Sequence, residues 1–266
     1  MTFAGKVVVV TGASSGIGRA LCLELAPQKP RLVLAARDEN ALREVAAACE
    51  LKGAETLVVP TDVSSEEQCR RLVEHSVERF PVIDVLVANA GITMWSPFEE
   101  MKDLSLYEKL MRVNFLGSVY PAFYALPHLK KSRGRIVVLS SLAGLTGVPT
   151  RTGYAATKHA LFGFFDSLRI ELEGSGVTVT MIAPDFVVSD IHRRAIGPDG
   201  TPLGQSPMQE SKIMSTEDCA RHIVRAMTQR KRLWIGSARG RIGRWVRLVA
   251  PGVIDAVARR AIREGR

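Results

Sequence analysis

The amino-acid sequence predicts an α/β fold in which a doubly wound parallel sheet is flanked by helices. Short apolar, β-branched runs alternate with helical patterns from the N-terminus onward. The apolar runs show little polar–apolar alternation, as expected for strands that are covered on both faces. Of the 266 residues 46% are apolar and 24% are charged, which excludes a disordered chain and suits one large domain. We therefore expect a single domain with a sheet of about seven strands.

Six runs are predicted to be strands. They are Lys6–Thr11, Leu32–Ala36, Thr56–Pro60, Asp84–Ala88, Arg135–Ser140 and Val177–Ile182. The helical stretches between them are Gly16–Ala26, Glu39–Leu51, Glu66–Phe80, Ser105–Lys131 and Tyr154–Glu173. This alternation predicts parallel strands joined by helical crossovers. Pro121 and Pro127 fall inside the fourth helical stretch, where we expect a kink or a break.

The pattern loosens after the sixth predicted strand. Residues 184–215 are rich in Pro, Gly, Ser and charge, and a segment of this length is typically a lid, a binding loop or disordered. A helix is predicted to begin at Ser215 or Thr216, because acids fill its first turn. The sequence thus divides into a domain over 1–240, which includes a substrate loop at 186–214, and a basic C-terminal tail over 241–266.

The positive charge is concentrated near the C-terminus. The formal net charge is +9, but the chain from Arg221 onward holds 13 lysines and arginines against two acids, so the first 220 residues carry −2. That distribution argues against a nucleic-acid-binding core. In the tail, Ile242, Trp245, Val246 and Val249 share one apolar face at helical spacing. The tail is either an interfacial helix on an anionic membrane or a helix packed against the domain or a partner subunit.

A glycine-rich turn follows the first predicted strand. Thr11–Gly18 (TGASSGIG) carries glycines at positions 12, 16 and 18 and opens the first predicted helix. Glycines let the backbone approach a pyrophosphate, while the helix N-terminus offers unpaired N–H groups and a positive dipole end. An ordinary strand–helix turn is the alternative. The context favours a dinucleotide-binding, Rossmann-type sheet, because a strand precedes the turn, a helix follows it and a second strand ends about 20 residues on.

The end of the second predicted strand bears on the choice of dinucleotide. An enzyme that selects NAD places a carboxylate there for the ribose hydroxyls, but this strand ends in Ala35, Ala36 and Arg37. Arg37 can instead pair with the 2′-phosphate of NADP, and Arg19 would add a second positive charge. A register shift of one residue would place Asp38 at this position, and a solvated loop charge is the other reading of Arg37. We predict NADP(H).

Six motifs follow one another along the chain: Thr11–Gly18, Asp62-Val63, Asn89-Ala90-Gly91, Asn114, Ser141 and Tyr154-xxx-Lys158. In kind and order they resemble those of the short-chain dehydrogenase/reductase family, in its compact branch, and the match covers residues 5–185. The resemblance implies a homodimer or homotetramer through the helices at 105–131 and 154–173. It also implies a set of cofactor-binding residues: Gly12, Ser14, Ser15, Gly16, Ile17, Gly18, Asp62, Val63, Asn89, Ala90, Gly91, Tyr154, Lys158, Pro184, Val187 and Ser189. The tail is similar to that of reductases related to the hydroxysteroid dehydrogenases.

Tyr154 and Lys158 are predicted to be catalytic, because they lie four residues apart on one helix face. An ammonium within ~4 Å would favour the phenolate by about 4 kcal/mol at an effective dielectric near 20, roughly three pKa units before desolvation opposes it. Tyr154 would then be the acid for carbonyl reduction and the base for alcohol oxidation. Ser141 would hold the substrate oxygen; strand alternation allows only one of Ser140 and Ser141 to face the site, and the family spacing favours Ser141.

Two further positions carry family expectations. By resemblance, Asn114 holds a local irregularity in its helix and anchors a water that links Lys158 to solvent; a purely structural role is the alternative. After the sixth strand the family commonly has Pro-Gly, followed shortly by Thr, whereas this chain has Pro184-Asp185 and then Ser189. Asp185 loses the conformational freedom of glycine and adds a charge near the cofactor.

The sequence therefore predicts an NADP(H)-dependent oxidoreductase that interconverts a ketone or aldehyde and an alcohol, with Tyr154 as acid and base. The substrate loop and the tail favour a lipophilic substrate. The alternative is a dinucleotide-binding regulatory or membrane-associated protein with incidental turnover. No metal is expected, because the five histidines show no metal-ligand spacing with the cysteines or with each other. No nucleic acid is expected, because the excess positive charge lies in the tail and not in the body of the chain.

The expected location is the cytoplasm. The strand pattern begins within six residues of Met1, which leaves no room for a signal peptide. Four separated cysteines are expected to be reduced: Cys22, Cys49, Cys69 and Cys219. If the tail binds lipid, the protein would be peripheral at the inner membrane face.

Overall fold

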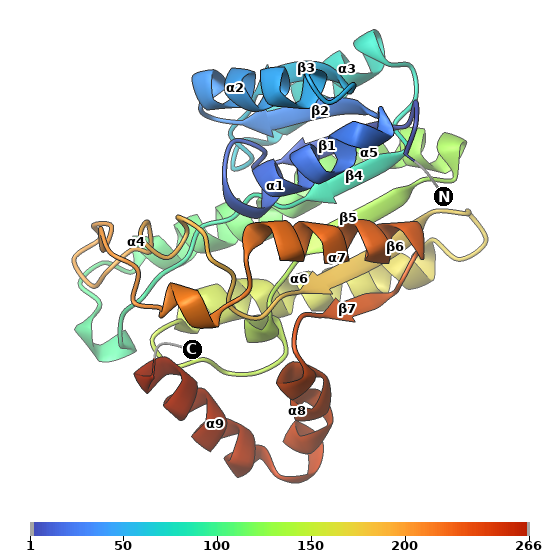
Figure 1. Ribbon diagram of the computed structural model, residues 1–266. Coiled ribbons are helices and arrows are strands. Elements are labelled where there is room, and N and C mark those ends of the chain that lie inside the picture. Colours follow the sequence, from blue (N-terminus) through green and yellow to red (C-terminus); the bar gives the residue numbers. More distant parts are fainter. Residues whose placement is uncertain (1–2, 265–266) are drawn as a thin grey trace.

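A computed structural model describes residues 3–264 of the chain (Figure 1). A parallel sheet of seven strands, in the order β3-β2-β1-β4-β5-β6-β7, forms its centre. The strands are β1 (Val7–Thr11), β2 (Arg31–Ala36), β3 (Glu55–Pro60), β4 (Val85–Ala88), β5 (Arg135–Leu139), β6 (Thr178–Ala183) and β7 (Leu233–Ile235). The predicted doubly wound sheet is confirmed, and the six predicted strands agree with β1–β6 to within one residue. The pattern did not locate β7, because three residues are too few to show a strand period.

Two apolar layers cover the sheet. Val8 and Val10 of β1 belong to the layer under α1 (Gly16–Leu25), α2 (Glu39–Glu50) and α7 (Thr216–Thr228). Val7 and Val9 belong to the opposite layer, under α3 (Glu66–Arg79), α5 (Gly117–Ser132) and α6 (Thr152–Glu171). Successive residues of a strand point to opposite faces, so a strand covered on both sides must be apolar throughout.

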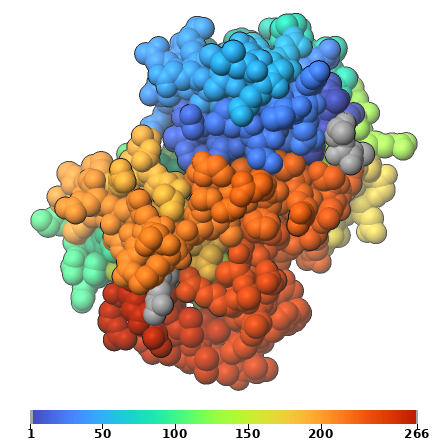
Figure 2. Space-filling model, viewed as in Figure 1, coloured from blue at the N-terminus to red at the C-terminus, as the bar shows by residue number. Residues whose placement is uncertain are grey.

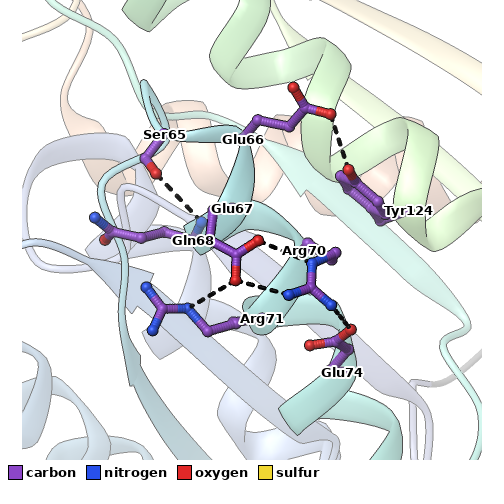
Figure 3. Close-up of polar contacts among 8 residues, drawn as sticks. All are labelled: Ser65, Glu66, Glu67, Gln68, Arg70, Arg71, Glu74 and Tyr124. Atoms are coloured by element: carbon purple, nitrogen blue, oxygen red, sulfur yellow. Dashed lines mark hydrogen bonds and ion pairs between the residues drawn. The ribbon is translucent and has the colours of Figure 1, made fainter.

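Polar contacts along α3 join it to α5 (Figure 3). The Ser65 hydroxyl accepts a hydrogen bond from the Gln68 amide and caps the helix. Arg70 forms ion pairs with acids on either side of it along the helix. The Tyr124 hydroxyl of α5 donates to Glu66 at 2.9 Å. Exposed pairs of this kind contribute little stability each, so the layer beneath them holds the helices in place.

The fourth helical stretch is interrupted upstream of its prolines. It consists of α4 (Ser105–Leu110), a π-helical segment (Met111–Leu116) and α5, which contains both Pro121 and Pro127. The break expected at the prolines is therefore not found there: α5 continues through both, and the interruption lies before Gly117. It surrounds Asn114, whose side chain bonds the backbone of Ile92 on a neighbouring loop.

The C-terminal residues form a helical hairpin that closes one side of the molecule. Helices α8 (Ala238–Val249) and α9 (Pro251–Arg263) lie below the sheet in Figure 1. Of the substrate loop, only Glu210–Lys212 forms a short 3-10 turn. The loop lies beside α9 in Figure 2, and Gln209 donates to the Glu264 carbonyl at 2.9 Å. The hairpin begins at Ala238, three residues before the expected boundary.

Among residues 3–264, no helix is both long enough and apolar enough to cross a membrane.

Candidate active site

A cavity of about 1230 Å³ opens at the C-terminal edge of the sheet. Its lining extends from Asp62, after β3, to Pro184, after β6, and on to α8 and α9. In open α/β sheets ligands bind at this edge, where the strand order reverses; here the reversal lies between β1 and β4. The volume exceeds the roughly 300–1,000 Å³ of a pocket for one small ligand, so a dinucleotide and a substrate can share it.

The glycine-rich turn is packed too closely for side chains. Gly12 has φ +66°, and a Cβ there would lie 2.9 Å from the Ala90 Cα atom. A Cβ at Gly18 would lie 2.2 Å from the Gly12 carbonyl oxygen. The Asn89 amide donates to the carbonyls of Thr11 (2.9 Å) and Gly12 (3.2 Å), which fixes the turn. At the N-terminus of α1 the Ser15 side chain makes no capping hydrogen bond, so this end of the helix suits the phosphates of a dinucleotide.

Arg37 and Asp38 have different environments at the end of β2. Asp38 is the N-cap of α2, and its carboxylate accepts a hydrogen bond from the Ala41 amide at 3.0 Å. Arg37 is exposed and lines the cavity, as Asp62 does. Burial raises the pKa of Asp62, but hydrogen bonds from Ser64 and the positive charge of Arg37 outweigh this and lower it. Arg37 therefore supplies a positive charge at this end of the cavity.

Most of the predicted cofactor-binding residues line the cavity. The exceptions are Gly18, which packs behind the turn, and Arg19. Arg19 is exposed on α1 and lines a smaller neighbouring depression with Ser189 and Glu217. Arg19 therefore does not line the cavity that Arg37 lines.

Ser141 and Tyr154 form a hydrogen-bonded pair in the cavity wall. Burial raises the pKa of Tyr154, while the charge of Arg151 and the bond with Ser141 oppose the shift only in part. Lys158 is buried on the same helix; its Nζ donates to the Leu139 carbonyl at 2.8 Å and lies 5.5 Å from the centre of the Tyr154 ring. Burial lowers the pKa of Lys158 to about 8.

The expected downward shift of the Tyr154 pKa by Lys158 is not found. The shift is upward, because burial of the phenol is its largest cause. The Lys158 ammonium is turned to a backbone carbonyl, and Arg151 is the cation that lowers the Tyr154 pKa.

Strand alternation separates the two serines after β5. The Ser140 hydroxyl donates to the Lys158 carbonyl at 3.1 Å and is buried. The Ser141 hydroxyl accepts from the Ala143 amide at 3.2 Å and bonds with Tyr154. Ser141 is thus the one whose hydroxyl pairs with the phenol.

Asn114 lies behind the cavity wall. Its Oδ1 accepts from the Ile92 amide at 2.8 Å, and its Nδ2 donates to the Ile92 carbonyl and to the Thr157 hydroxyl, both at 3.0 Å. Atoms of Asn114 and Lys158 both lie against Gly91, where a Cβ would be 3.2 Å from Asn114 Oδ1 and 3.8 Å from Lys158 Nζ. The expected helix irregularity is present as the π-helical segment.

Asp185 replaces the usual glycine without backbone strain. Positive φ among the described non-glycine residues occurs only at Lys29, Arg133, Thr150 and Arg230. The Asp185 carboxylate accepts two hydrogen bonds from Arg239 of α8, at 2.8 and 2.9 Å. Its charge is therefore paired, and it fastens the hairpin to the loop after β6.

Arg151 and His192 form a buried group that is not among the residues predicted from the sequence. The Arg151 guanidinium lies 4.5 Å from the ring centre of Trp95, 5.3 Å from that of Phe186 and 5.6 Å from that of Tyr154. Its Nη2 donates to His192 Nδ1 at 3.1 Å, and His192 Nε2 donates to the Val187 carbonyl at 3.2 Å. The one available signal was a basic residue a single helical turn before Tyr154.

Comparisons with known proteins agree with this geometry. A family model described as short chain dehydrogenase matches residues 6–197. A protein named 11-beta-hydroxysteroid dehydrogenase A, from Sesamum indicum, is 40% identical over 262 residues, which cover 96% of this chain and 75% of the relative.

Two solved structures are similar to this chain. A short chain dehydrogenase/reductase from Burkholderia phymatum, in complex with NAD, has a TM-score of 0.84 and 26% identity; the match covers 95% of this chain and 96% of the other. An alcohol dehydrogenase from the archaeon Thermococcus sibiricus, complexed with 5-hydroxy-NADP, has a TM-score of 0.74 and 27% identity, covering 86% and 95%. This chain belongs to the short-chain dehydrogenase/reductase family, and it is an oxidoreductase built to bind a nicotinamide dinucleotide.

Proposed function

We propose that the protein is an NADP(H)-dependent oxidoreductase that interconverts a ketone or aldehyde and an alcohol on a lipophilic substrate. The observation that carries the proposal is the Ser141–Tyr154 pair, which lies beside buried Lys158 in the cavity that holds the glycine-rich turn. A bound nicotinamide dinucleotide supplies or accepts the hydride.

The raised pKa of Tyr154 fits a proton donor, because the phenol stays protonated at neutral pH. In carbonyl reduction Tyr154 gives this proton to the substrate oxygen, which the Ser141 hydroxyl holds in place and whose developing negative charge it stabilises. The resulting phenolate lies near two cations, Arg151 and Lys158. In the direction of oxidation Tyr154 accepts the proton of the alcohol.

The preference for NADP rests on Arg37. Asp38 is held as the cap of α2, while Arg37 faces the cavity, where it can pair with a 2′-phosphate.

The direct test of the NADP preference is fluorescence titration with NADPH and NADH. The wild type is expected to bind NADPH more tightly, and Arg37→Ala to weaken NADPH binding by about ten- to a hundredfold. Arg19→Ala, which removes the arginine outside the cavity, is the matched control. Equal binding of NADH by the wild type would contradict the assignment.

A lipophilic substrate is proposed because α9 turns apolar side chains toward the cavity. Five residues of α9 line the cavity, and all five are apolar: Ile254, Val257, Ala258, Ala261 and Ile262. A screen of lipophilic ketones and aldehydes follows the loss of NADPH absorbance, with Tyr154→Phe as the inactive variant. If binding of NADPH is normal but no carbonyl compound is turned over, the regulatory, dinucleotide-binding alternative is favoured.

We further propose that the α8–α9 hairpin contacts an anionic membrane surface, at the cytoplasmic face. Four large apolar side chains of α8 are mostly exposed: Ile242 (64%), Trp245 (61%), Leu248 (73%) and Val249 (85%). Arginines surround them, which complements anionic headgroups. Co-sedimentation is expected with phosphatidylglycerol vesicles and not with phosphatidylcholine vesicles, and Trp245→Ser with Leu248→Ser is expected to reduce it. Sedimentation that is unchanged by this pair of substitutions would contradict the proposal.

We also propose a homodimer or homotetramer through α5 and α6. Phe123 of α5 and Ile170 of α6 are large apolar side chains that are exposed on the single chain. Light scattering after size exclusion measures the mass, and a monomer at micromolar concentration would rule the assembly out.

A further inference from the structure

Arg151 is a buried cation without an acidic partner. Only 4% of the residue is exposed, and burial lowers its pKa to about 10. No ion pair among residues 3–264 includes Arg151, and its Nε has no hydrogen-bond partner there. A guanidinium carries five N–H donors, and burying a charge without a counter-charge is costly.

The surroundings compensate this charge only in part. The faces of Trp95, Phe186 and Tyr154 offer weak cation–π attraction, and His192 offers one uncharged acceptor. A hydrogen bond from a cation to a carboxylate is roughly twice as strong as one between neutral groups. An anion would therefore bind the N–H groups of Arg151 more strongly than their present partners do, and the described residues do not supply one.

The residue before Arg151 has a strained backbone conformation, which helps to fix the position of the Arg151 side chain. Thr150 has φ +65°, a left-handed conformation that is costly for a β-branched residue. The Thr150 carbonyl accepts a hydrogen bond from the Ser96 amide at 2.9 Å, next to Trp95. Strain of this kind persists where the surroundings fix it, and it gathers at ligand sites.

We propose that Arg151 receives the carboxylate of an oxo acid or hydroxy acid, so that the lipophilic substrate of this site is an acid. The inference rests on the proposed carbonyl–alcohol chemistry and names its substrate class. Nε and Nη2 form the side-on fork of a guanidinium, which accommodates both oxygens of a carboxylate. In this protein the same two atoms of Arg239 bind both oxygens of Asp185, at 2.8 and 2.9 Å.

The path to Arg151 runs through the loop after β6. Phe186 and His192, which cover the guanidinium, both belong to this loop and line the cavity. A small shift of the loop replaces His192 at Nη2 by the carboxylate and exposes Nε. Because Arg151 lies one helical turn before Tyr154, the acid and the carbonyl of one molecule can reach the two residues together. The apolar chain of that molecule then lies along α9.

The test compares straight-chain oxo acids with their methyl esters, which lack the negative charge and carry one additional methyl group. For the wild type we expect kcat/KM to favour the acid by about ten- to a hundredfold. Arg151→Met is expected to remove this preference, while Arg151→Lys, which keeps the charge but not the fork, keeps part of it. Arg169→Met removes a positive charge from the far end of the same helix and is the matched control.

A second measurement does not depend on turnover. Calorimetric titration with a saturated fatty acid and with the corresponding primary alcohol is expected to show binding of the acid that Arg151→Met weakens by a similar factor. Thermal melting and NADPH binding confirm that each variant is folded.

Two results would overturn the inference. One is equal use of acids and esters by a wild type that reduces ketones, which leaves the carbonyl chemistry standing. The other is an equal loss of rate on acids and esters in Arg151→Met, with a shifted pH profile, which would make Arg151 a partner of Tyr154 alone. If the wild type reduces no carbonyl compound while the fatty acid still binds through Arg151, the proposed chemistry fails and the carboxylate site remains.

Discussion

Ser140 and Ser141 are neighbours in the chain with different partners. The Ser141 hydroxyl bonds with Tyr154, whereas that of Ser140 supports the backbone carbonyl of Lys158. We expect Ser141→Ala to lower kcat by about 10²–10³-fold, as for the loss of one oxyanion donor, with little change in Tm. Ser140→Ala should leave kcat within about tenfold and lower the free energy of unfolding by about 1 kcal/mol. Steady-state kinetics and thermal melting of the two variants, measured side by side, check this. The reverse pattern would assign the substrate oxygen to Ser140.

The site residues that could be predicted from the sequence are those whose relative position follows from one helix or from the end of one strand. Tyr154 and Lys158 share a helix, so their proximity follows from local geometry, and Ser141 follows β5 by two residues, which places it at the C-terminal edge of the sheet. Arg151 and His192 meet only because the loop after β6 folds back over α6, and no periodicity encodes that contact. The spacing predicts that Lys158 lowers the Tyr154 pKa before desolvation opposes it. In the structure desolvation is the largest cause and the net shift is upward, and the extent of burial is something that a spacing does not give.

At the scale of elements, one ion pair couples the hairpin to the active-site loop. Arg239 of α8 holds Asp185, which is mostly buried. Asp185→Asn is expected to loosen α8 by about 1–2 kcal/mol, because the charge-assisted pair is lost while the backbone is kept. Hydrogen exchange should then be faster in α8, with β4 unchanged.

The matched control for this substitution is Arg260→Gln. It breaks the pair of Arg260 with Glu264 at the C-terminal end of α9 and should have little effect on α8. Unchanged exchange of α8 amides in Asp185→Asn would mean that packing, such as that of Gly240 on Leu142, holds the hairpin alone.

Helices and strands could be predicted from the sequence where their apolar periodicity extends over enough residues. The helices of the sheet layers and six strands follow from apolar periodicity, whereas β7 has three residues and owes its place to pairing with β6. The interruption before α5 arises from the hydrogen bonds of Asn114 to Ile92, a contact across the fold, and not from the helix sequence that contains Pro121 and Pro127.

At the scale of the whole molecule, the tail is part of the site. The sequence separates residues 241–266 from the domain by charge and composition, yet α8 and α9 supply a wall of the cavity. The same helices carry exposed apolar side chains on their outer surface. One hairpin therefore connects the surface proposed to contact lipid with the space proposed to hold a lipophilic substrate, an arrangement that hydropathy along the chain could not specify.

The stability of the folded protein should depend on pH through His192. Burial, and then the charge of Arg151, lower its pKa to about 4, against an ordinary value of 6.5. Between these values the unfolded chain binds a proton that the folded protein does not, so the free energy of unfolding rises with pH across this window. The contribution is fully present above pH 6.5 and is lost as the pH falls through about 4, up to about 3 kcal/mol at about 1.36 kcal/mol per pKa unit.

His192→Gln isolates this effect. The glutamine amide can accept from Arg151 and donate to the Val187 carbonyl as His192 does, but it does not titrate. Urea unfolding between pH 4 and 7 should therefore show a steeper loss of stability in the wild type than in the variant, with the two curves converging in slope above pH 6.5. Parallel curves throughout would mean that other groups, the paired carboxylates among them, govern acid unfolding. In that case the Arg151–His192 contact would be open enough to admit a proton at little cost, and the same openness would ease the entry of a substrate carboxylate.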